Sequence, residues 1–340
     1  MKHKLPNVFS TTSYLGTRYG VRGTAATYFV LRTSYLISYL IFISLFFLAG
    51  CTSNQGKPVD GKSKLRIVTT TGMIKDAVEN VAGDQVEVIA LMGPGVDPHL
   101  YKATQGDLQK LTDADVVFYN GLHLEGKMGE VLEKLGKTKP VIAVASGIPD
   151  SLLRTVPGFQ GTHDPHIWFD VKRWEYAVHT ISDFLQQHDT AQAKNYSERS
   201  KRYILQLDSL HEQVKQSLQQ VPEAQRVLIT AHDAFGYFGD AYHIHVRGLQ
   251  GISTVSEFGL KDVTELVNFI ISRKIKAIFI ETSVSHKSIE AVVAGCRDKN
   301  WNVKIGGSLY SDAMGPAGTP EGTYIGMVSA NVKTIVDALK

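Results

Sequence analysis

Three histidines of this chain lie where ligands collect in α/β proteins. His99 follows a Gly-Pro-Gly turn after a predicted strand over 86–91, and His232 comes directly after a predicted strand over 226–230. His166 lies just before a predicted helix. In open parallel sheets, ligands bind outside the carboxyl ends of the strands. Imidazole is the commonest protein ligand for a transition metal, so these positions predict a metal site.

Asp312 is the carboxylate best placed to complete such a site. It follows a predicted strand over 303–305, in the same half of the chain as His232, whereas His99 and His166 belong to the first half. Three imidazoles around a divalent cation favour one anionic ligand to balance the charge. Spacing alone leaves this set of four a hypothesis.

The other histidines have simpler interpretations. His243 and His245 alternate in a strand-like Tyr-His-Ile-His-Val segment, where a solvated strand face is favoured over a second metal site. His123 lies in a loop after a predicted strand and is a weaker candidate for contact with the site. Packing, surface or helix-cap roles suffice for the following four: His179, His188, His211 and His286.

A metal-dependent hydrolase is the main alternative to metal capture. Catalytic zinc normally keeps three protein ligands and an open position for water, whereas four protein ligands leave no activated water. The sequence contains no His-Glu-x-x-His, Gly-x-Ser-x-Gly or P-loop pattern. Glu257 and Glu281 are possible general bases, but a structural or ligand-supporting role is favoured for both. The sequence therefore favours a non-enzymatic metal receptor; a surface adhesin with a structural metal is the alternative.

The elements that must position these residues alternate between strand and helix patterns. Such alternation predicts βαβ units and a mostly parallel sheet flanked by helices in each of two α/β lobes. We expect an N-terminal lobe over 65–170 and a C-terminal lobe over 191–340. The strand patterns cover 65–70, 86–91, 115–119, 141–144, 226–230, 277–281 and 303–305.

A long helical pattern separates the two lobes. Apolar residues from 171 to 190 follow one helix face, and a second helical run covers roughly 191–220. We expect 171–190 to form a rigid spine helix. Such a connector limits movement between the lobes to a small tilt.

Charge is unevenly distributed along the 340 residues. The chain has 36 basic and 33 acidic side chains, but the first 50 residues contain five basic and no acidic ones. The remainder therefore carries a net charge of about −2, which excludes a broadly basic surface for nucleic acid. Two cysteines rule out a disulfide framework.

The first 50 residues read as an export leader. An uncharged stretch over 33–50 follows Arg32, and its last three residues with the next one form Leu-Ala-Gly-Cys51, which resembles the bacterial lipobox. We expect lipid on Cys51 and a polar tether over 51–64. A single transmembrane anchor is the alternative, since about 18 apolar residues can just cross a bilayer. Both interpretations place 65–340 outside the cytoplasm, at the periplasm or cell surface.

Five motifs in order resemble the zinc/manganese solute-binding proteins of ABC transporters, the cluster A-I, TroA-like family. The resemblance covers about 64–340. The motifs are MGPGVDPHLY at 92–101, NGLHLE at 120–125, DPHIWFD at 164–170, TAHDAFGYF at 230–238 and SLYSD at 308–312.

This resemblance implies a function and a ligand set. The family fold is two α/β lobes on a rigid helix, with the metal between them. Its ligands fall on His99, His166, His232 and Asp312, the branch with three histidines. The chain would bind one Zn²⁺ or Mn²⁺ ion and act as a monomer. It would deliver the ion to a membrane permease driven by a cytoplasmic ATPase. The His-rich loop of another family branch is missing here.

Overall fold

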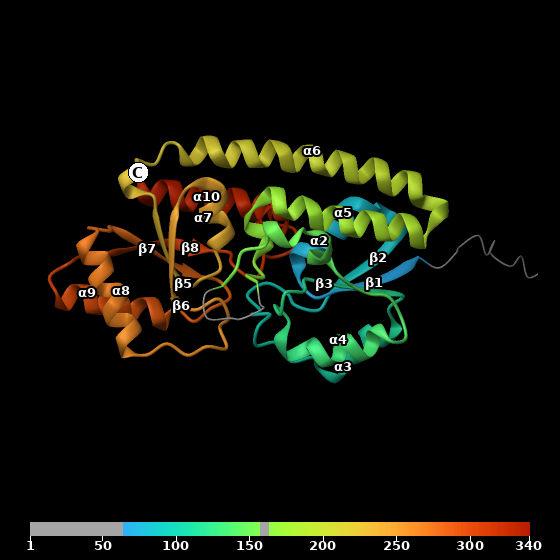
Figure 1. Cartoon of the computed structure of the whole chain (residues 1–340), viewed down its shortest axis with the longest axis horizontal. Coiled ribbons are helices and arrows are strands. Elements are labelled where there is room, and N and C mark those ends of the chain that lie inside the picture. The colour runs from blue at the N-terminus through green and yellow to red at the C-terminus, as the bar shows by residue number, and fades with distance from the viewer. Residues whose placement is uncertain (1–63, 157–162) are drawn as a thin grey trace, which may run out of the picture. The chain divides into compact units, whose positions relative to one another are not determined.

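The structure, a computed structural model, describes residues 64–156 and 163–340 (Figure 1). The predicted leader, Cys51 and almost all of the predicted tether lie outside the described residues. Within the part that is described, no helix combines the length and the apolar character needed to cross a membrane.

The N-terminal lobe is built on four parallel strands in the order β2-β1-β3-β4 (Figure 1). Their bounds are β1 Leu65–Thr69, β2 Val86–Ala90, β3 Val116–Tyr119 and β4 Val141–Ala143.

Alternate residues of these strands pack against different helices. Ile67 belongs to the core shared with helix α2, while its neighbour Val68 packs with helices α3 and α4 on the other face, as the two-residue period of a strand requires. The three helices are α2 Gly72–Ala82, α3 Gln105–Asp113 and α4 Gly129–Gly136.

The C-terminal lobe contains two parallel pairs, β5-β6 and β7-β8, with β5 and β7 adjacent (Figure 1). Helices α8 and α9 cover one face, while α7 and α10 pack with the main core on the other. The strands are β5 Val227–His232, β6 His245–Gln250, β7 Ala277–Glu281 and β8 Lys304–Leu309. The helices are α7 Gly236–Tyr242, α8 Leu260–Ser272, α9 Lys287–Asp298 and α10 Tyr324–Leu339.

Two packed helices connect the lobes. Helix α5 (Val171–His188) contacts α2 of the N-terminal lobe, and α6 (Ala193–Leu218) runs back beside it (Figure 1). Helix α6 contacts α2 of the N-terminal lobe and α10 of the C-terminal lobe. Helix α5, which covers most of the predicted spine at 171–190, also contacts both lobes, through α2 and through the stacking of Trp174 on Tyr324 of α10. We keep 65–170 and 191–340 as proposed lobe boundaries.

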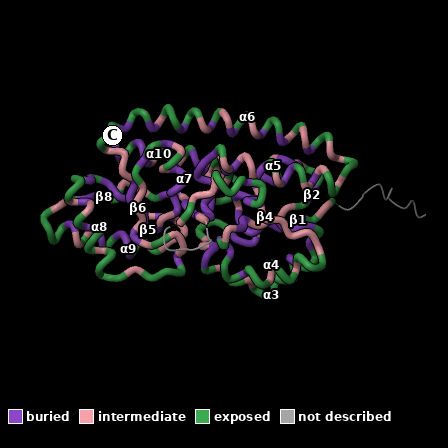
Figure 2. Tube along the Cα trace, viewed as in Figure 1, coloured by how far each residue is buried: buried purple, intermediate pink, exposed green. Residues whose placement is uncertain are grey.

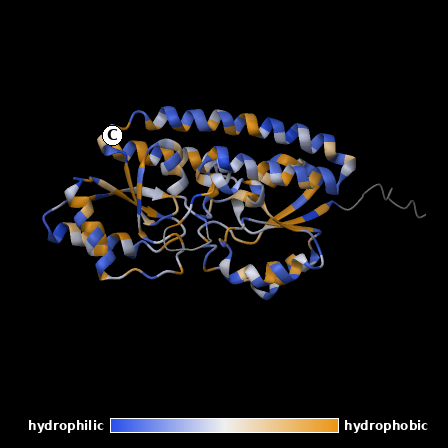
Figure 3. Ribbon diagram, viewed as in Figure 1, coloured by the Kyte–Doolittle hydropathy of each residue, from blue (hydrophilic) through white to orange (hydrophobic). Residues whose placement is uncertain are grey.

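Helix α6 presents an apolar stripe to the protein and a polar face to solvent (Figures 2 and 3). Its buried residues recur every three or four positions, the spacing of one helix face. They are Tyr196, Ser200, Tyr203, Leu207, Leu210, Val214 and Leu218. Strands β1, β3, β5 and β7 are mostly buried.

The predicted fold class, two α/β lobes with parallel strands and a long connecting helix, is confirmed. A difference appears at His243 and His245, which do not share a strand. His243 ends α7 in the left-handed conformation with φ 57°, and His245 begins β6. Both are exposed, consistent with the solvated interpretation.

Candidate metal centre

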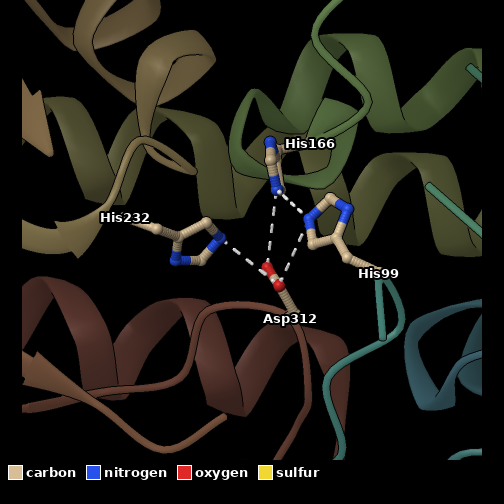
Figure 4. A group of neighbouring side chains, drawn as sticks. All are labelled: His99, His166, His232 and Asp312. Carbon is tan, nitrogen blue, oxygen red and sulfur yellow. Dashed lines mark hydrogen bonds and ion pairs between the residues drawn. The ribbon is translucent and has the colours of Figure 1, made fainter. Parts of the chain in front are cut away.

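Four side chains from separate segments converge where the two lobes meet (Figure 4). They are His99, His166, His232 and Asp312, and each offers a ligand atom within 4.8 Å of the others. None of the four is more than 2% exposed. The structure therefore brings together every residue that the sequence analysis singled out as a metal ligand.

Parallel-strand topology accounts for three of these positions. His99 lies in the loop after β2, His232 is the last residue of β5, and Asp312 follows β8. His166 instead precedes a 3₁₀ turn, Ile167–Phe169, that leads into α5. Each lobe contributes two ligands.

A buried carboxylate orients His166. Asp164 Oδ1 lies 2.7 Å from His166 Nδ1 and accepts the His166 backbone N–H at 3.0 Å. The Asn120 amide donates to the Pro165 carbonyl at 2.9 Å and holds the same segment. These contacts leave Nε2 of His166 facing the centre. A carboxylate on the outer nitrogen fixes the tautomer and ring orientation of a metal-binding histidine.

Glu281 performs the same task for His232. Its Oε2 lies 2.5 Å from His232 Nδ1, and its Oε1 accepts the His232 backbone N–H at 2.9 Å. Glu281 ends β7, the neighbour of β5. A Cβ at Gly248 of β6 would lie 2.5 Å from the Asp233 backbone nitrogen, so only glycine permits the close approach of β6 to this end of β5.

The segment that carries His99 is attached to the other lobe. Asp97 Oδ1 accepts the His99 backbone N–H at 2.9 Å, and Asp97 Oδ2 accepts the Thr254 hydroxyl at 2.6 Å. Thr254 belongs to the loop between β6 and α8. A carboxylate of the N-terminal lobe thus links His99 to the C-terminal lobe.

Asp312 lies among the three imidazoles. Its Oδ2 is 3.3 Å from His232 Nε2 and 3.6 Å from His99 Nε2, and its Oδ1 is 3.6 Å from His166 Nε2. Among the described residues, His232 Nε2 and both Asp312 oxygens are buried without a hydrogen-bond partner. Buried polar atoms are normally satisfied, and these are the atoms a central cation would satisfy.

The pKa shifts follow from this crowding. Burial lowers the pKa of His99 to about 3, and the neighbouring imidazoles add to the effect. Burial also acts to lower the pKa of His232, but Glu281 and Asp312 outweigh it and raise that pKa well above its ordinary value. Burial opposes ionisation of Asp312, yet the imidazoles hold its pKa well below the usual range. Asp312 is therefore ionised at neutral pH.

The remaining candidates lie elsewhere. His123 lines a cavity of about 280 Å³ that also reaches His99 and His163, so it lies near the centre without joining it. Glu257 is exposed in the loop before α8. His179, His188 and His286 are exposed, and His286 makes no side-chain cap bond to α9.

Two supporting carboxylates had no role in the sequence interpretation. Asp164 and Asp97 each lie two residues before a ligand histidine, and both belong to Asp-Pro-His motifs. The repeated motif is the signal that could have identified them. For Glu281 the sequence favours a structural or ligand-supporting role, and the contact with His232 agrees with it. Which histidine Glu281 supports could not be predicted, because 49 residues separate the two in the chain.

A buried site with three nitrogen ligands and one carboxylate suits a borderline transition metal. Together with two α/β lobes on a long helix, it defines a class: a two-lobed binding protein with a metal site at the lobe junction. Residues 67–338 match the family model described as ZnuA, zinc-uptake complex component A, periplasmic. The chain belongs to this family.

Individual relatives match over nearly their whole length. The chain is 51% identical to the manganese-binding lipoprotein MntA of Bacillus subtilis strain 168, over 88% of this chain and 97% of the relative. It is 48% identical to the zinc-binding protein TroA of Treponema pallidum strain Nichols, over 87% and 96%. The solved structure of the periplasmic zinc-binding protein TroA from T. pallidum superposes with a TM-score of 0.80 at 50% identity, covering 82% of this chain and 99% of that one.

Proposed function

We propose that His99, His166, His232 and Asp312 bind one Zn²⁺ or Mn²⁺ ion per chain as cargo for import. One observation carries the proposal: a buried cluster takes two ligands from each lobe and leaves inward-facing polar atoms without hydrogen bonds. The names of the relatives MntA and TroA, manganese-binding and zinc-binding, support both metals.

Three imidazoles and one carboxylate suit capture of a metal ion better than catalysis. Four protein ligands fill a tetrahedral zinc sphere and leave no position for an activated water. The outer carboxylates Asp164 and Glu281 each contact a histidine ring nitrogen, so both are engaged in orienting ligands. Because both lobes supply ligands, metal binding and the relative position of the lobes are coupled.

The delivery of the bound ion to a membrane permease is inferred from the family and from the predicted export leader. Relatives include one named a metal ABC transporter substrate-binding lipoprotein. This supports capture outside the cytoplasm and transfer to an ABC permease driven by a cytoplasmic ATPase. Lipid on Cys51 would hold the chain at the membrane, with 51–64 as tether. We expect the protein to act as a monomer.

Elemental analysis of purified 52–340 tests the metal stoichiometry. After dialysis against metal-free buffer, a sample loaded with Zn²⁺ or Mn²⁺ should retain about one equivalent. His166→Ala should lose it, whereas His179→Ala, a change at an exposed histidine on α5, should not. Two tightly held equivalents would implicate His163 or the pair His243 and His245. No retained metal in the wild-type protein would refute the proposal.

A further inference from the structure

Trp168 connects the metal-binding segments of the two lobes. It lies two residues after His166, in the 3₁₀ turn Ile167–Phe169, and is only 1% exposed. We propose that Trp168 is a positioning residue that fixes Asp312 of the C-terminal lobe relative to His166 of the N-terminal lobe. This inference rests on the proposed function of the four ligands.

Two hydrogen bonds carry the proposal. The indole Nε1 of Trp168 donates to the backbone carbonyl of Ser311 at 3.0 Å, and Ser311 directly precedes Asp312. The hydroxyl of Tyr324, the first residue of α10, donates to the Trp168 backbone carbonyl at 2.8 Å. Both partners belong to the C-terminal lobe. A single residue is therefore held to that lobe through its side chain and its main chain.

Ring packing extends the link to the histidines. The Trp168 indole meets the His166 imidazole edge to face, with ring centroids 5.3 Å apart. The next residue, Phe169, stacks on Phe235, with ring centroids 4.1 Å apart. Phe235 lies three positions after His232 in the chain. The segment that follows His166 thus contacts the segments that bear two other ligands.

The indole bond has a direct consequence for the ligand geometry. Asp312 itself has weak anchorage: its backbone N–H lies 3.4 Å from the Ser283 hydroxyl, and its carboxylate oxygens have no hydrogen-bond partner among the described residues. The Trp168 bond to the preceding carbonyl is shorter and fully buried. Its loss would leave the Ser311 carbonyl unpaired and allow the Asp312 turn to move away from the imidazoles.

The test is Trp168→Phe, which retains an aromatic ring and removes the donor. Two matched controls exist, because the chain has three tryptophans. Trp174→Phe alters a buried indole whose Nε1 has no partner among the described residues; its ring stacks on Tyr324, a contact that phenylalanine can keep. Trp301→Phe removes an indole bond to the Ile275 carbonyl at 2.8 Å, within the other core of the C-terminal lobe.

Metal affinity is measured by chelator competition, and the release rate by stopped flow, on a purified protein of residues 52–340. Trp168→Phe should weaken Zn²⁺ and Mn²⁺ binding about tenfold or more, the usual effect of losing a group that orients ligands. It should also speed release. The visible spectrum of bound Co²⁺ should change, because Asp312 moves within the ligand field. Both control variants should keep wild-type affinity and spectrum, whatever their melting temperatures.

Wild-type affinity and spectrum in Trp168→Phe would overturn the positioning role and leave metal capture intact. Equal weakening in all three variants would overturn it too, because the effect would then be one of general packing. If Trp168→Phe does not fold, Tyr324→Phe replaces it. That variant removes only the hydroxyl bond to Trp168 and should weaken binding in the same direction; unchanged affinity would again contradict the proposal. Failure of the wild-type protein to bind metal would count against the proposed function instead.

Discussion

At the scale of single residues, the centre is organised in two layers. Asp164 and Glu281 contact the outer nitrogens of His166 and His232 and leave the inner nitrogens facing the centre. Asp312 is the sole carboxylate among the four candidate ligands. Its role can therefore be separated from that of the imidazoles.

Asp312→Asn should weaken Mn²⁺ binding proportionally more than Zn²⁺ binding. Manganese prefers oxygen ligands and would lose its only anionic one, whereas zinc keeps three imidazoles. Competition titrations with a chromophoric chelator measure both affinities, with the exposed Asp337→Asn on α10 as control. An equal fall for the two metals would show that Asp312 does not discriminate between them.

The wild-type site should bind Zn²⁺ with a lower dissociation constant than Mn²⁺. Nitrogen-rich sites follow the Irving–Williams order, in which zinc exceeds manganese. The same chelator competition, run with both ions on one preparation, checks the order. Tighter binding of manganese would contradict it. The transported ion also depends on which metal is available outside the cell.

At the scale of elements, three helices meet at a buried carboxylate away from the metal centre. Asp76 of α2 accepts the Tyr203 hydroxyl of α6 at 2.9 Å and the Tyr324 backbone N–H at the start of α10. Burial raises the pKa of Asp76 from 3.8 to about 6, against the lowering effect of these hydrogen bonds. Helix α6 is thus linked to α2 of one lobe and to α10 of the other through the single carboxyl group of Asp76.

Asp76→Asn should change the pH dependence of folding stability. Because the folded pKa exceeds the ordinary value, an ionised Asp76 costs stability above about pH 6, and the cost disappears as the pH falls towards 3.8. The full shift corresponds to about 3 kcal/mol, of which about 1 kcal/mol is already present at pH 4.5. Relative to wild type, the variant should therefore gain about 2 kcal/mol more stability at pH 7.5 than at pH 4.5. Urea unfolding of metal-free protein at both pH values measures this difference. A difference that does not vary with pH would exclude the raised pKa.

At the scale of the whole molecule, α6 restricts how far the lobes separate. Its 26 residues make a rod about 39 Å long at 1.5 Å per residue, packed against helices of both lobes. Two hydrogen bonds cross the lobe junction beside the candidate ligands: Trp168 donates to Ser311, and Thr254 donates to Asp97. We expect metal release to involve a small tilt and local loop movement rather than wide opening.

Cys51→Ser should abolish labelling of the protein by a clickable fatty acid in cells and release it from the membrane. The expectation rests on the Leu-Ala-Gly-Cys51 sequence that ends the apolar stretch. Labelling that persists in the variant would exclude Cys51 as the lipid site. Unprocessed wild-type precursor in the membrane would favour the transmembrane anchor.

The fold class and the four candidate ligands could be predicted from the sequence, the ligands from their positions after strands together with the family resemblance. Both depend on local signals: strand and helix periodicity is written in consecutive residues, and each ligand lies in a short motif at the end of an element. His99 and His232 follow strands directly, so the rule for parallel sheets could place them without coordinates.

The partner of each supporting group, and the packing of the long helices against the lobes, follow from the three-dimensional packing alone. Glu281 reaches His232 because β7 lies beside β5, and Trp168 reaches Ser311 across 143 residues of chain. Helices α5 and α6 have similar amphipathic patterns, so periodicity could not tell how each of them packs against the two lobes. Such contacts depend on how faces pack between distant segments, and local sequence patterns carry no information about that packing.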